Sequence, residues 1–484
     1  MPWTFPLAET APQVTLLAVE SVDTPAWQSP ASDFGAATVM RPFERVVGRI
    51  ASAIHFEVWL PPLAGERAWN GKFLGVGNGG LAGSLNYPAM ADALARGYAT
   101  ASTDTGHQAA IWDARWMMDA PDALADFGYR AIHEMSAAAF AIVSAYYGRP
   151  AARRYFTGCS GGGHQGLVLA QRYPADYDGI VVGAPANFPT HMWPGETYAA
   201  WLLRRAPDGM ALKSKLPLIH QPVVAACGNA DGVVADPPRC PFDPRSLVRG
   251  EADAPDSLTP TQAETVARIY EGLRDPFTGE PFWPGYEPGS ELGWADTLFG
   301  VPGIPTGYLK YLVFGDPDWD WLSFDFTDPR DFARLVAAHE KYAPVLNATN
   351  PDLSAFKGRG GKLLMYHGWA DQNIAPRNSI AYYESVVAAM GEVETGAFMR
   401  LFMVAGLGHC RGGEGATEID PLAALERWVE DGAAPDHLPA AHVTPDGIVD
   451  YTREVLKHPP HDTIATNHRV DETCWGRTEP RHVL

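Results

Sequence analysis

Three residues whose types cooperate in acyl transfer, Ser160, Asp371 and His409, each follow a strand-like run of the chain. A serine hydroxyl is a poor nucleophile near neutral pH until a neighbouring base takes its proton. An unperturbed histidine titrates in the range that suits this work, so His409 is the candidate base. A carboxylate beside it would fix the imidazole tautomer and stabilise the imidazolium, which is the role predicted for Asp371. Together, the three residues predict nucleophilic catalysis through an acyl-enzyme.

The candidate nucleophile lies in the pattern Gly158-x-Ser160-x-Gly162, between a strand-like run at 154–157 and a helix-like run at 164–173. This is the pattern of a nucleophile elbow, a turn so tight that side chains at the glycine positions would collide with the neighbouring strand and helix. By itself the pattern is short, and a glycine-rich loop with an incidental serine explains it equally well. The order serine, aspartate, histidine after successive strands favours the elbow, because it is the order of α/β-hydrolases.

Backbone amides are the expected partners for the negative charge that develops on a substrate carbonyl oxygen. The amide of Gly161, next to the candidate nucleophile, is one predicted donor. A glycine loop follows the strand-like run 71–77, and the amide of Gly79 or Gly80 in this loop is the second predicted donor. Taken alone, the loop also fits a plain turn.

The elements around these residues alternate between strand-like and helix-like patterns. This alternation predicts a doubly wound, mostly parallel sheet of the α/β class. Residues 1–45 show little periodicity and are expected to form an N-terminal extension, and no internal repeat is visible. The predicted strands are 55–60, 71–77, 98–103, 154–157, 178–185, 361–367 and 400–404.

The alternation stops between about 190 and 355, where the chain is rich in proline, glycine and aromatic residues. The region is too long for a loop, so we expect an inserted lid domain. An insertion at this point would cover the carboxyl edge of the sheet, where open α/β sheets bind ligands. The predicted organisation is a first core part at 1–189, the lid at 190–355, and a second core part with a C-terminal tail at 356–484.

The composition narrows the possible partners. The chain has 484 residues, 46% of them hydrophobic, which is enough for a large core. The net charge of -20 argues against a nucleic-acid or anionic-membrane partner, and no apolar run is long enough to span a bilayer. The N-terminus lacks the basic and apolar segments of a signal peptide, so the sequence leaves the compartment open, as it does the oligomeric state.

Two of the five cysteines flank the candidate catalytic residues. Cys159 immediately precedes Ser160, and Cys410 immediately follows His409. If the serine and histidine are hydrogen-bonded, these cysteines fall within the Cα separation of about 4.4–6.8 Å that a disulfide needs. We therefore predict a Cys159–Cys410 bridge; two buried thiols are the alternative.

The chain resembles the tannase and feruloyl esterase family, which also contains mono(2-hydroxyethyl) terephthalate hydrolase. The segments that carry the resemblance are Gly158–Gly162, Tyr366–Asp371 and Gly408–Cys410, within a similarity that runs from about residue 40 to 440. The resemblance implies an α/β-hydrolase core with a large lid, the triad and the bridge described above, and esters of small aromatic acids as substrates. No cofactor is required for this chemistry.

Two other activities stay open beside feruloyl ester or gallate ester hydrolysis. One is hydrolysis of mono(2-hydroxyethyl) terephthalate or another aryl ester, and the other is a non-catalytic binding module on a hydrolase scaffold. The intact serine, aspartate and histidine argue against the binding module.

The resemblance also bears on the loop that begins at Cys227. It implies a lid-loop disulfide between Cys227 and Cys240. Many members of the family hold calcium on an aspartate-rich loop that follows a cysteine, and the members are often secreted or periplasmic. The loop looks shortened here, and its candidate ligands are Asp231, Val233 and Asp236. A metal-free turn is the alternative.

Aromatic side chains of the predicted lid, such as Trp283 and Trp294, are candidates to stack on the acyl ring, although most of them are expected to form a core. Asn373 and Ile374, just past Asp371, are candidates to line the acyl pocket. The tail has ligand-type residues with irregular spacing, which predicts a solvated segment and not a metal site. These residues are His458, His461, His468 and Cys474.

Overall fold

A computed structural model describes residues 13–23, 26–51, 53–65 and 68–459. At its centre is a nine-stranded sheet with the order β1-β4-β5-β7-β6-β8-β9-β12-β13. The strands from β7 to β13 are parallel, and β1, β4 and β5 are antiparallel. The predicted α/β class and mostly parallel sheet are confirmed. The strands are β1 (Val14–Val22), β4 (Phe43–Ile50), β5 (Ile54–Leu60), β6 (Lys72–Val76), β7 (Ala99–Thr103), β8 (Arg153–Cys159), β9 (Gly179–Gly183), β12 (Lys362–Gly368) and β13 (Met399–Val404).

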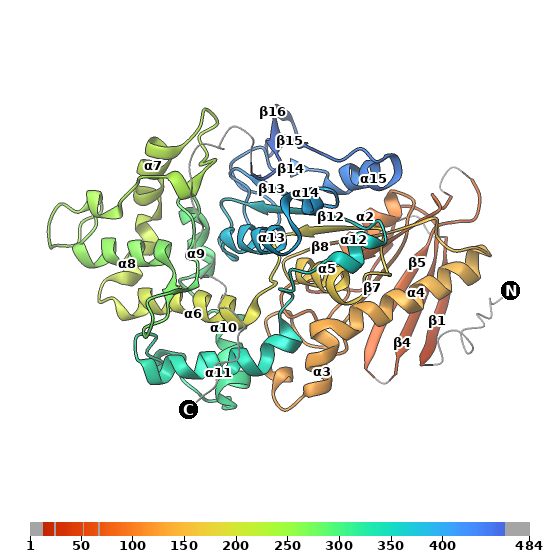
Figure 1. The fold of residues 1–484 in the computed structure, drawn as a ribbon, viewed down its shortest axis with the longest axis horizontal. Coiled ribbons are helices and arrows are strands. Elements are labelled where there is room, and N and C mark those ends of the chain that lie inside the picture. The colour runs from red at the N-terminus through yellow and green to blue at the C-terminus, as the bar shows by residue number, and fades with distance from the viewer. Residues whose placement is uncertain (1–12, 24–25, 52, 66–67, 460–484) are drawn as a thin grey trace.

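Helices cover both faces of this sheet, as Figure 1 shows. One face packs against α4 (Ala131–Tyr147), α5 (Gly161–Arg172) and α13 (Arg377–Met390). The other face packs against α2 (Tyr87–Ala95) and α15 (Pro421–Asp431). The apolar residues of α4 recur every three or four positions, so they lie on one face of the helix, and this face is buried against the sheet. Within the described ranges no helix is long and apolar enough to cross a bilayer.

The chain between β9 and β12 forms a separate group of elements. All residues from 184 to 361 are described, and none of them adds a strand to the nine-stranded sheet. The group gathers at one side of the sheet, in green and cyan-green in Figure 1, around an aromatic-rich core that also includes residues such as Leu81, Phe127 and Ile374. Its elements are α6 (Pro189–Arg205), α7 (Leu216–Cys227), α8 (Pro260–Glu271), β10 (Leu273–Arg274), β11 (Pro281–Trp283), α9 (Trp294–Thr297), α10 (Gly303–Tyr308) and α11 (Pro329–Leu346).

The region predicted as an N-terminal extension, residues 1–45, contributes strands to the central sheet. The strand β1 pairs with β4 along its whole length and forms the edge of the sheet. Its apolar residues Leu17 and Val19 are on the solvent side, 50% and 37% exposed. Both faces of the strand therefore carry apolar residues, and the alternation that marks a half-buried strand is lost from the sequence.

The C-terminal region is also more ordered than predicted. After α15 the chain forms a hairpin of β15 (His437–Val443) and β16 (Val449–Leu456), which joins the short strand β14 (Glu418–Ile419). Most side chains of β16 are exposed, so the hairpin carries a polar sequence that reads as a tail. Of the ligand-type tail residues only His458 is described; His461, His468 and Cys474 lie outside the described residues.

Candidate active site

Ser160 occupies a strained turn between β8 and α5. Its backbone has φ 60° and ψ −121°, a region that non-glycine residues rarely adopt. A Cβ on Gly158 would lie 2.4 Å from the carbonyl oxygen of Gly162, and one on Gly162 would lie 2.6 Å from that of Asn78. Both positions therefore require glycine, for the steric reason expected of a nucleophile elbow.

The hydroxyl of Ser160 is not committed to a structural role. Ser160 is the N-cap residue of α5, yet its side chain makes no capping hydrogen bond. The first amides of a helix have no intrahelical partner, and the helix dipole adds partial positive charge there. The amide of Gly161 is such a group, and within the described part of the chain it donates no hydrogen bond. Within the described residues, the head of α5 thus offers a hydroxyl without a hydrogen-bond partner beside a free amide donor.

The glycine loop after β6 lies directly against the head of α5. A Cβ on Gly161 would lie 2.9 Å from the carbonyl oxygen of Gly80 and 3.4 Å from the Cα of Gly79, so the two backbones are almost in contact. The amides of Gly79 and Gly80 donate no hydrogen bond to any described residue. The structure thus brings together the three backbone groups that the sequence predicts as oxyanion donors.

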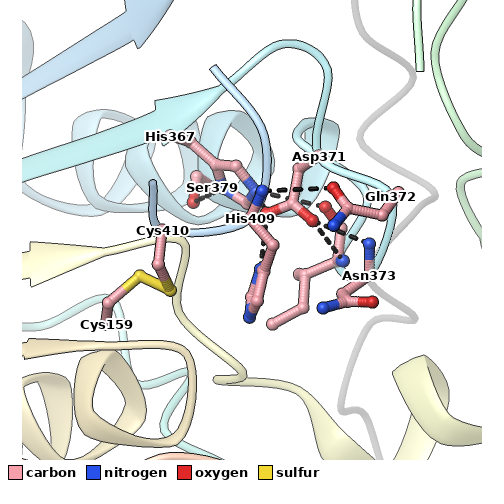
Figure 2. The surroundings of a disulfide bond; sticks show 9 residues. Cys159, His367, Asp371, Gln372, Asn373, Ser379, His409 and Cys410 are labelled. Carbon is pink, nitrogen blue, oxygen red and sulfur yellow. Dashed lines mark hydrogen bonds and ion pairs between the residues drawn. A yellow bond between two sulfur atoms is a disulfide. The ribbon is translucent and has the colours of Figure 1, made fainter. Parts of the chain in front are cut away.

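A disulfide joins the elbow to the loop after β13. Cys159 and Cys410 are 251 positions apart in sequence and are bonded, with their Cα atoms 5.9 Å apart (Figure 2). The bridge places the residue before Ser160 next to the residue after His409. The predicted lid-loop bridge between Cys227 and Cys240 is also present, with a Cα separation of 5.3 Å.

Asp371 is fully buried and all of its acceptor positions are used. One carboxylate oxygen accepts hydrogen bonds from Nδ1 of His409, at 2.8 Å, and from Nε2 of His367, at 3.1 Å (Figure 2). The other oxygen accepts from the backbone amides of Asn373 and Ile374, at 2.8 and 2.9 Å. Four donors on two oxygens fix the orientation of the carboxylate, and through it the plane of the His409 ring.

The surroundings of Asp371 favour its ionised form. Burial alone would raise the pKa of this carboxyl, but the charge of His409 and the hydrogen bonds from His367 and His409 hold the pKa below its ordinary value. An ionised carboxylate can only accept, so Nδ1 of His409 carries a hydrogen and Nε2 is left with the lone pair. This is the tautomer that a general base for a serine hydroxyl requires.

A model of the family described as "Tannase and feruloyl esterase" matches residues 37–473. The chain belongs to this family. An uncharacterised esterase of Xanthomonas campestris is 36% identical, over 94% of this chain and 87% of the relative. A probable feruloyl esterase B-2 of Aspergillus terreus is 32% identical, over 94% of this chain and 88% of the relative.

Solved structures agree with this assignment. The crystal structure of feruloyl esterase B from Aspergillus oryzae superposes with a TM-score of 0.80 and 28% identity, covering 92% of this chain and 93% of that one. The chain is thus an esterase of the feruloyl esterase and tannase type.

Two residues of the site were missed from the sequence. His367, completely buried, donates from Nε2 to Asp371 and to the carbonyl oxygen of Ile374, at 3.1 Å each, while its Nδ1 lies 2.7 Å from the hydroxyl of Ser379. It therefore helps to orient the carboxylate through the same oxygen that accepts the hydrogen bond from His409. Gln372 accepts a hydrogen bond from the backbone amide of His409 at 3.2 Å. The available signal was a histidine at the end of a buried strand, four positions before the acid.

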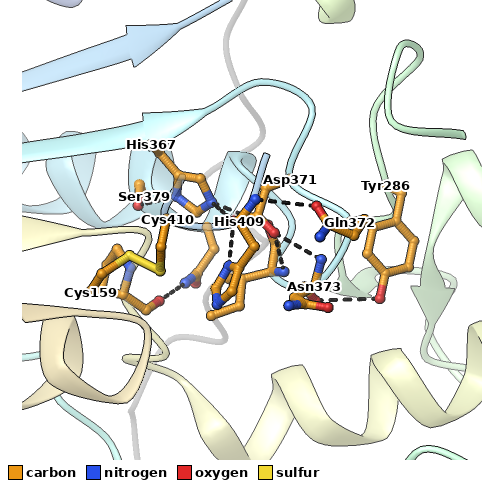
Figure 3. Close-up of polar contacts among 12 residues, drawn as sticks. Cys159, Tyr286, His367, Asp371, Gln372, Asn373, Ser379, His409 and Cys410 are labelled. Carbon is orange, nitrogen blue, oxygen red and sulfur yellow. Dashed lines mark hydrogen bonds and ion pairs between the residues drawn. A yellow bond between two sulfur atoms is a disulfide. The ribbon is translucent and has the colours of Figure 1, made fainter. Parts of the chain in front are cut away.

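The two tryptophans proposed as ring-stacking partners lie within the core of the inserted segment. Trp294 is 1% exposed and donates to Ser290 at 3.0 Å, and Trp283 is 3% exposed and lines a separate cavity of about 920 Å³. These positions match the aromatic-core alternative. The aromatic residue that reaches the acid loop is Tyr286, whose hydroxyl donates to the carbonyl oxygen of the half-buried Asn373 at 3.4 Å (Figure 3).

The residues proposed for calcium do not fit a calcium site. Both carboxylate oxygens of Asp231 accept hydrogen bonds from Arg453, and the carboxylate of Asp236 lies 3.3 Å from Arg239. The carbonyl oxygen of Val233 accepts the amide of Asn229 at 2.9 Å. Calcium needs six to eight oxygens that converge on one point. The two carboxylates and the carbonyl oxygen of Val233 instead each interact with a different donor of the protein. In the described ranges no three metal-binding side chains cluster.

We therefore expect EDTA to change neither activity nor thermal stability. The measurement is the unfolding temperature and the kcat/KM of the protein before and after dialysis against EDTA, with calcium added back in a parallel sample. A fall in unfolding temperature that calcium reverses would restore the metal site on the loop after Cys227.

Removing the Cys159–Cys410 bridge should lower both stability and activity. In the chain-entropy account a loop of this length contributes about 5 kcal/mol, against about 3 kcal/mol for the loop closed by Cys227 and Cys240. C159A/C410A should therefore lose more stability than C227A/C240A, measured by denaturant unfolding. Only C159A/C410A should also lose activity per folded molecule, since only that bridge holds the two reactive loops together. Equal activity in both variants would contradict this role.

Proposed function

We propose that this protein is a serine carboxylic ester hydrolase that acts on esters of small aromatic acids through an acyl-enzyme. The observation that carries the proposal is the 2.8 Å hydrogen bond between Asp371 and His409, on a loop that a disulfide ties to the residue before Ser160. Similarity to proteins named feruloyl esterase B supports the choice of substrate class.

In the proposed reaction the Oγ of Ser160 attacks the ester carbonyl carbon while Nε2 of His409 takes the hydroxyl proton. The carbonyl oxygen becomes an anion and accepts hydrogen bonds from the amides of Gly161 and of Gly79 or Gly80. His409 then gives its proton to the leaving alkoxide oxygen, and the alcohol departs from the acyl-enzyme. Water repeats the two steps and releases the acid.

The architecture we propose is an α/β-hydrolase core with a lid formed by residues 190–355, between core parts at 1–189 and 356–484. The hydrogen bond from Tyr286 to the carbonyl oxygen of Asn373 supports this arrangement, because it joins the inserted segment to the loop of Asp371. A lid in this place would exclude water from the reacting groups and strengthen their electrostatic interactions.

A substrate panel tests the proposal. We expect turnover of methyl ferulate or methyl gallate, each compared with mono(2-hydroxyethyl) terephthalate and p-nitrophenyl acetate. If only p-nitrophenyl acetate is hydrolysed, the serine chemistry stands and the aromatic substrate class is wrong. If no ester is hydrolysed and a fluorophosphonate probe fails to label the protein, the proposed function is wrong.

A further inference from the structure

Glu196 is an exception on a helix that is otherwise surrounded by protein. Every other residue of α6 from Pro189 to Leu203 is buried, and Glu196 alone is half-buried. On one side the helix packs so closely that a Cβ on Gly195 would lie 2.0 Å from the ring of Trp283. A side chain of such a helix meets solvent only where a cleft reaches it. Glu196 therefore lies at a solvent-accessible opening between α6 and its neighbours, which we call the cleft.

This cleft borders the loop of the candidate catalytic acid. Burial, and then the negative charges of Glu196 and Asp371, raise the pKa of the Tyr286 hydroxyl, and the charge of Asp371 also raises the pKa of Glu196 after burial. Tyr286 in turn donates to the carbonyl oxygen of Asn373, two residues after the acid (Figure 3). The three side chains thus share one region, and Glu196 faces it from the inserted segment.

The carboxyl of Glu196 has no partner among the described residues. It makes no hydrogen bond or ion pair with any of them, and the oxygens of Asp371 are already occupied by four donors. Burial, and then the negative charge of Asp371, raise the pKa of Glu196 well above its ordinary value, and no cation among the described residues lowers it. A half-buried carboxyl without a partner costs free energy, which a ligand with a matching polar group would recover.

The chemistry of that ligand follows from the charges. A protonated carboxyl can both donate and accept a hydrogen bond, and a hydroxyl group can serve as the acceptor or the donor that it needs. A second anion would enter a region that already holds the ionised Asp371, so a carboxylate on the substrate is disfavoured there.

We propose that Glu196 is a specificity-determining residue that hydrogen-bonds a neutral hydroxyl group of the ester substrate. The inference rests on the proposed function, because it takes the cleft beside Asp371 as the substrate site. The hydroxyl belongs either to the aromatic acid, as a phenol, or to the alcohol. Substrates that carry a carboxylate in its place should be poor.

Matched ester pairs separate these sources. Methyl p-coumarate against methyl cinnamate differs only in the phenolic hydroxyl, and 2-hydroxyethyl cinnamate against ethyl cinnamate only in a hydroxyl on the alcohol. In Glu196→Ala we expect kcat/KM for one hydroxylated ester to fall about 10- to 100-fold, mainly through KM, while its partner stays within about threefold. The pair that changes identifies the hydroxyl. Bis(2-hydroxyethyl) terephthalate should be a better substrate than its mono ester.

Two further variants complete the experiment. Glutamine has nearly the same shape as a protonated glutamate and keeps a donor and an acceptor. Glu196→Gln should therefore retain, within about threefold, the wild-type kcat/KM preference for the hydroxylated ester over its matched partner. Glu384→Ala is the matched control, since Glu384 on α13 is also half-buried and has a pKa raised by burial, to about 7, but lines the separate cavity. Glu384→Ala should leave the ratio of kcat/KM between the two esters of each matched pair unchanged.

Three results would overturn the assignment: unchanged preferences in Glu196→Ala, an equal fall for all four cinnamoyl esters, or a wild-type preference for the mono ester of terephthalate. These failures are distinguishable from failure of the proposed function. If a fluorophosphonate probe labels the protein and methyl cinnamate is hydrolysed, the esterase stands and only the role of Glu196 is wrong.

Discussion

Replacing Ser160 with alanine should lower kcat/KM for every ester substrate by about 10⁴- to 10⁶-fold without unfolding the protein. Alanine lacks the nucleophile but keeps a Cβ, so the strained backbone at φ 60° is no worse than in the wild type. The serine side chain makes no capping hydrogen bond, so the helix head loses no structural contact. We expect a change in unfolding free energy within about 0.5 kcal/mol.

The measurements are steady-state kinetics on methyl ferulate and p-nitrophenyl acetate, labelling by a fluorophosphonate probe, and thermal unfolding of each protein. Ser385→Ala is the matched control, because Ser385 lies on α13 and its hydroxyl bonds the carbonyl oxygen of Tyr382. The control should be labelled and fully active. Substantial activity in a folded Ser160→Ala variant would show that another residue is the nucleophile.

The parts of the site that could be predicted from sequence are those whose signals are local. The strands before Asp371 and His409 are mostly buried in a parallel sheet, so they read as short apolar runs. The strand before Ser160 has only the buried pair Tyr155 and Phe156, and the glycines around Ser160 follow from the tightness of one turn. The order serine, aspartate, histidine along the chain then indicated acyl transfer through a serine nucleophile. The bridge between Cys159 and Cys410 followed because each cysteine is the chain neighbour of a predicted catalytic residue.

The parts that could not be predicted depend on contacts between distant segments. Glu196 is one of several polar residues on α6, and only the packing of the helix reveals that Glu196 is half-buried beside the loop of Asp371. Trp283 and Trp294 show the opposite case, since composition cannot tell a core aromatic from one that lines a cleft. The strand β1 was missed for a related reason, because an edge strand with apolar residues on its solvent side has no alternation to detect.

Replacing Asp371 with asparagine should lower kcat/KM near neutral pH by about 10⁴-fold. The asparagine oxygen can still accept the amides of Asn373 and Ile374, which turns the NH₂ group toward Nδ1 of His409. Nδ1 must then accept, so the ring hydrogen moves to Nε2. The ring now presents a hydrogen where the serine proton has to go, and the general base is lost.

The same variant should change how stability depends on pH. The pKa of Asp371 is lower in the folded protein than its ordinary value of about 4, so the carboxylate stabilises the fold at pH values above about 4. This stabilisation is lost as the pH falls below about 4 toward the folded-state pKa. Asparagine does not titrate, so Asp371→Asn should be less stable than wild type at pH 7, and the difference should shrink on acidification.

Kinetics and denaturant unfolding at pH 7 and pH 3.5 test both expectations, with Asp236→Asn as the control because Asp236 is half-exposed and lies on a loop outside the site. The control should match wild type in both assays. If Asp371→Asn kept more than about a tenth of the wild-type kcat/KM, the His409 ring would have to be oriented by other contacts. Among the described residues, the other hydrogen-bond partner of His409 is Gln372, through the backbone amide. That bond fixes the loop but not the tautomer, so the full loss is expected to come from the single hydrogen bond between Asp371 and Nδ1 of His409.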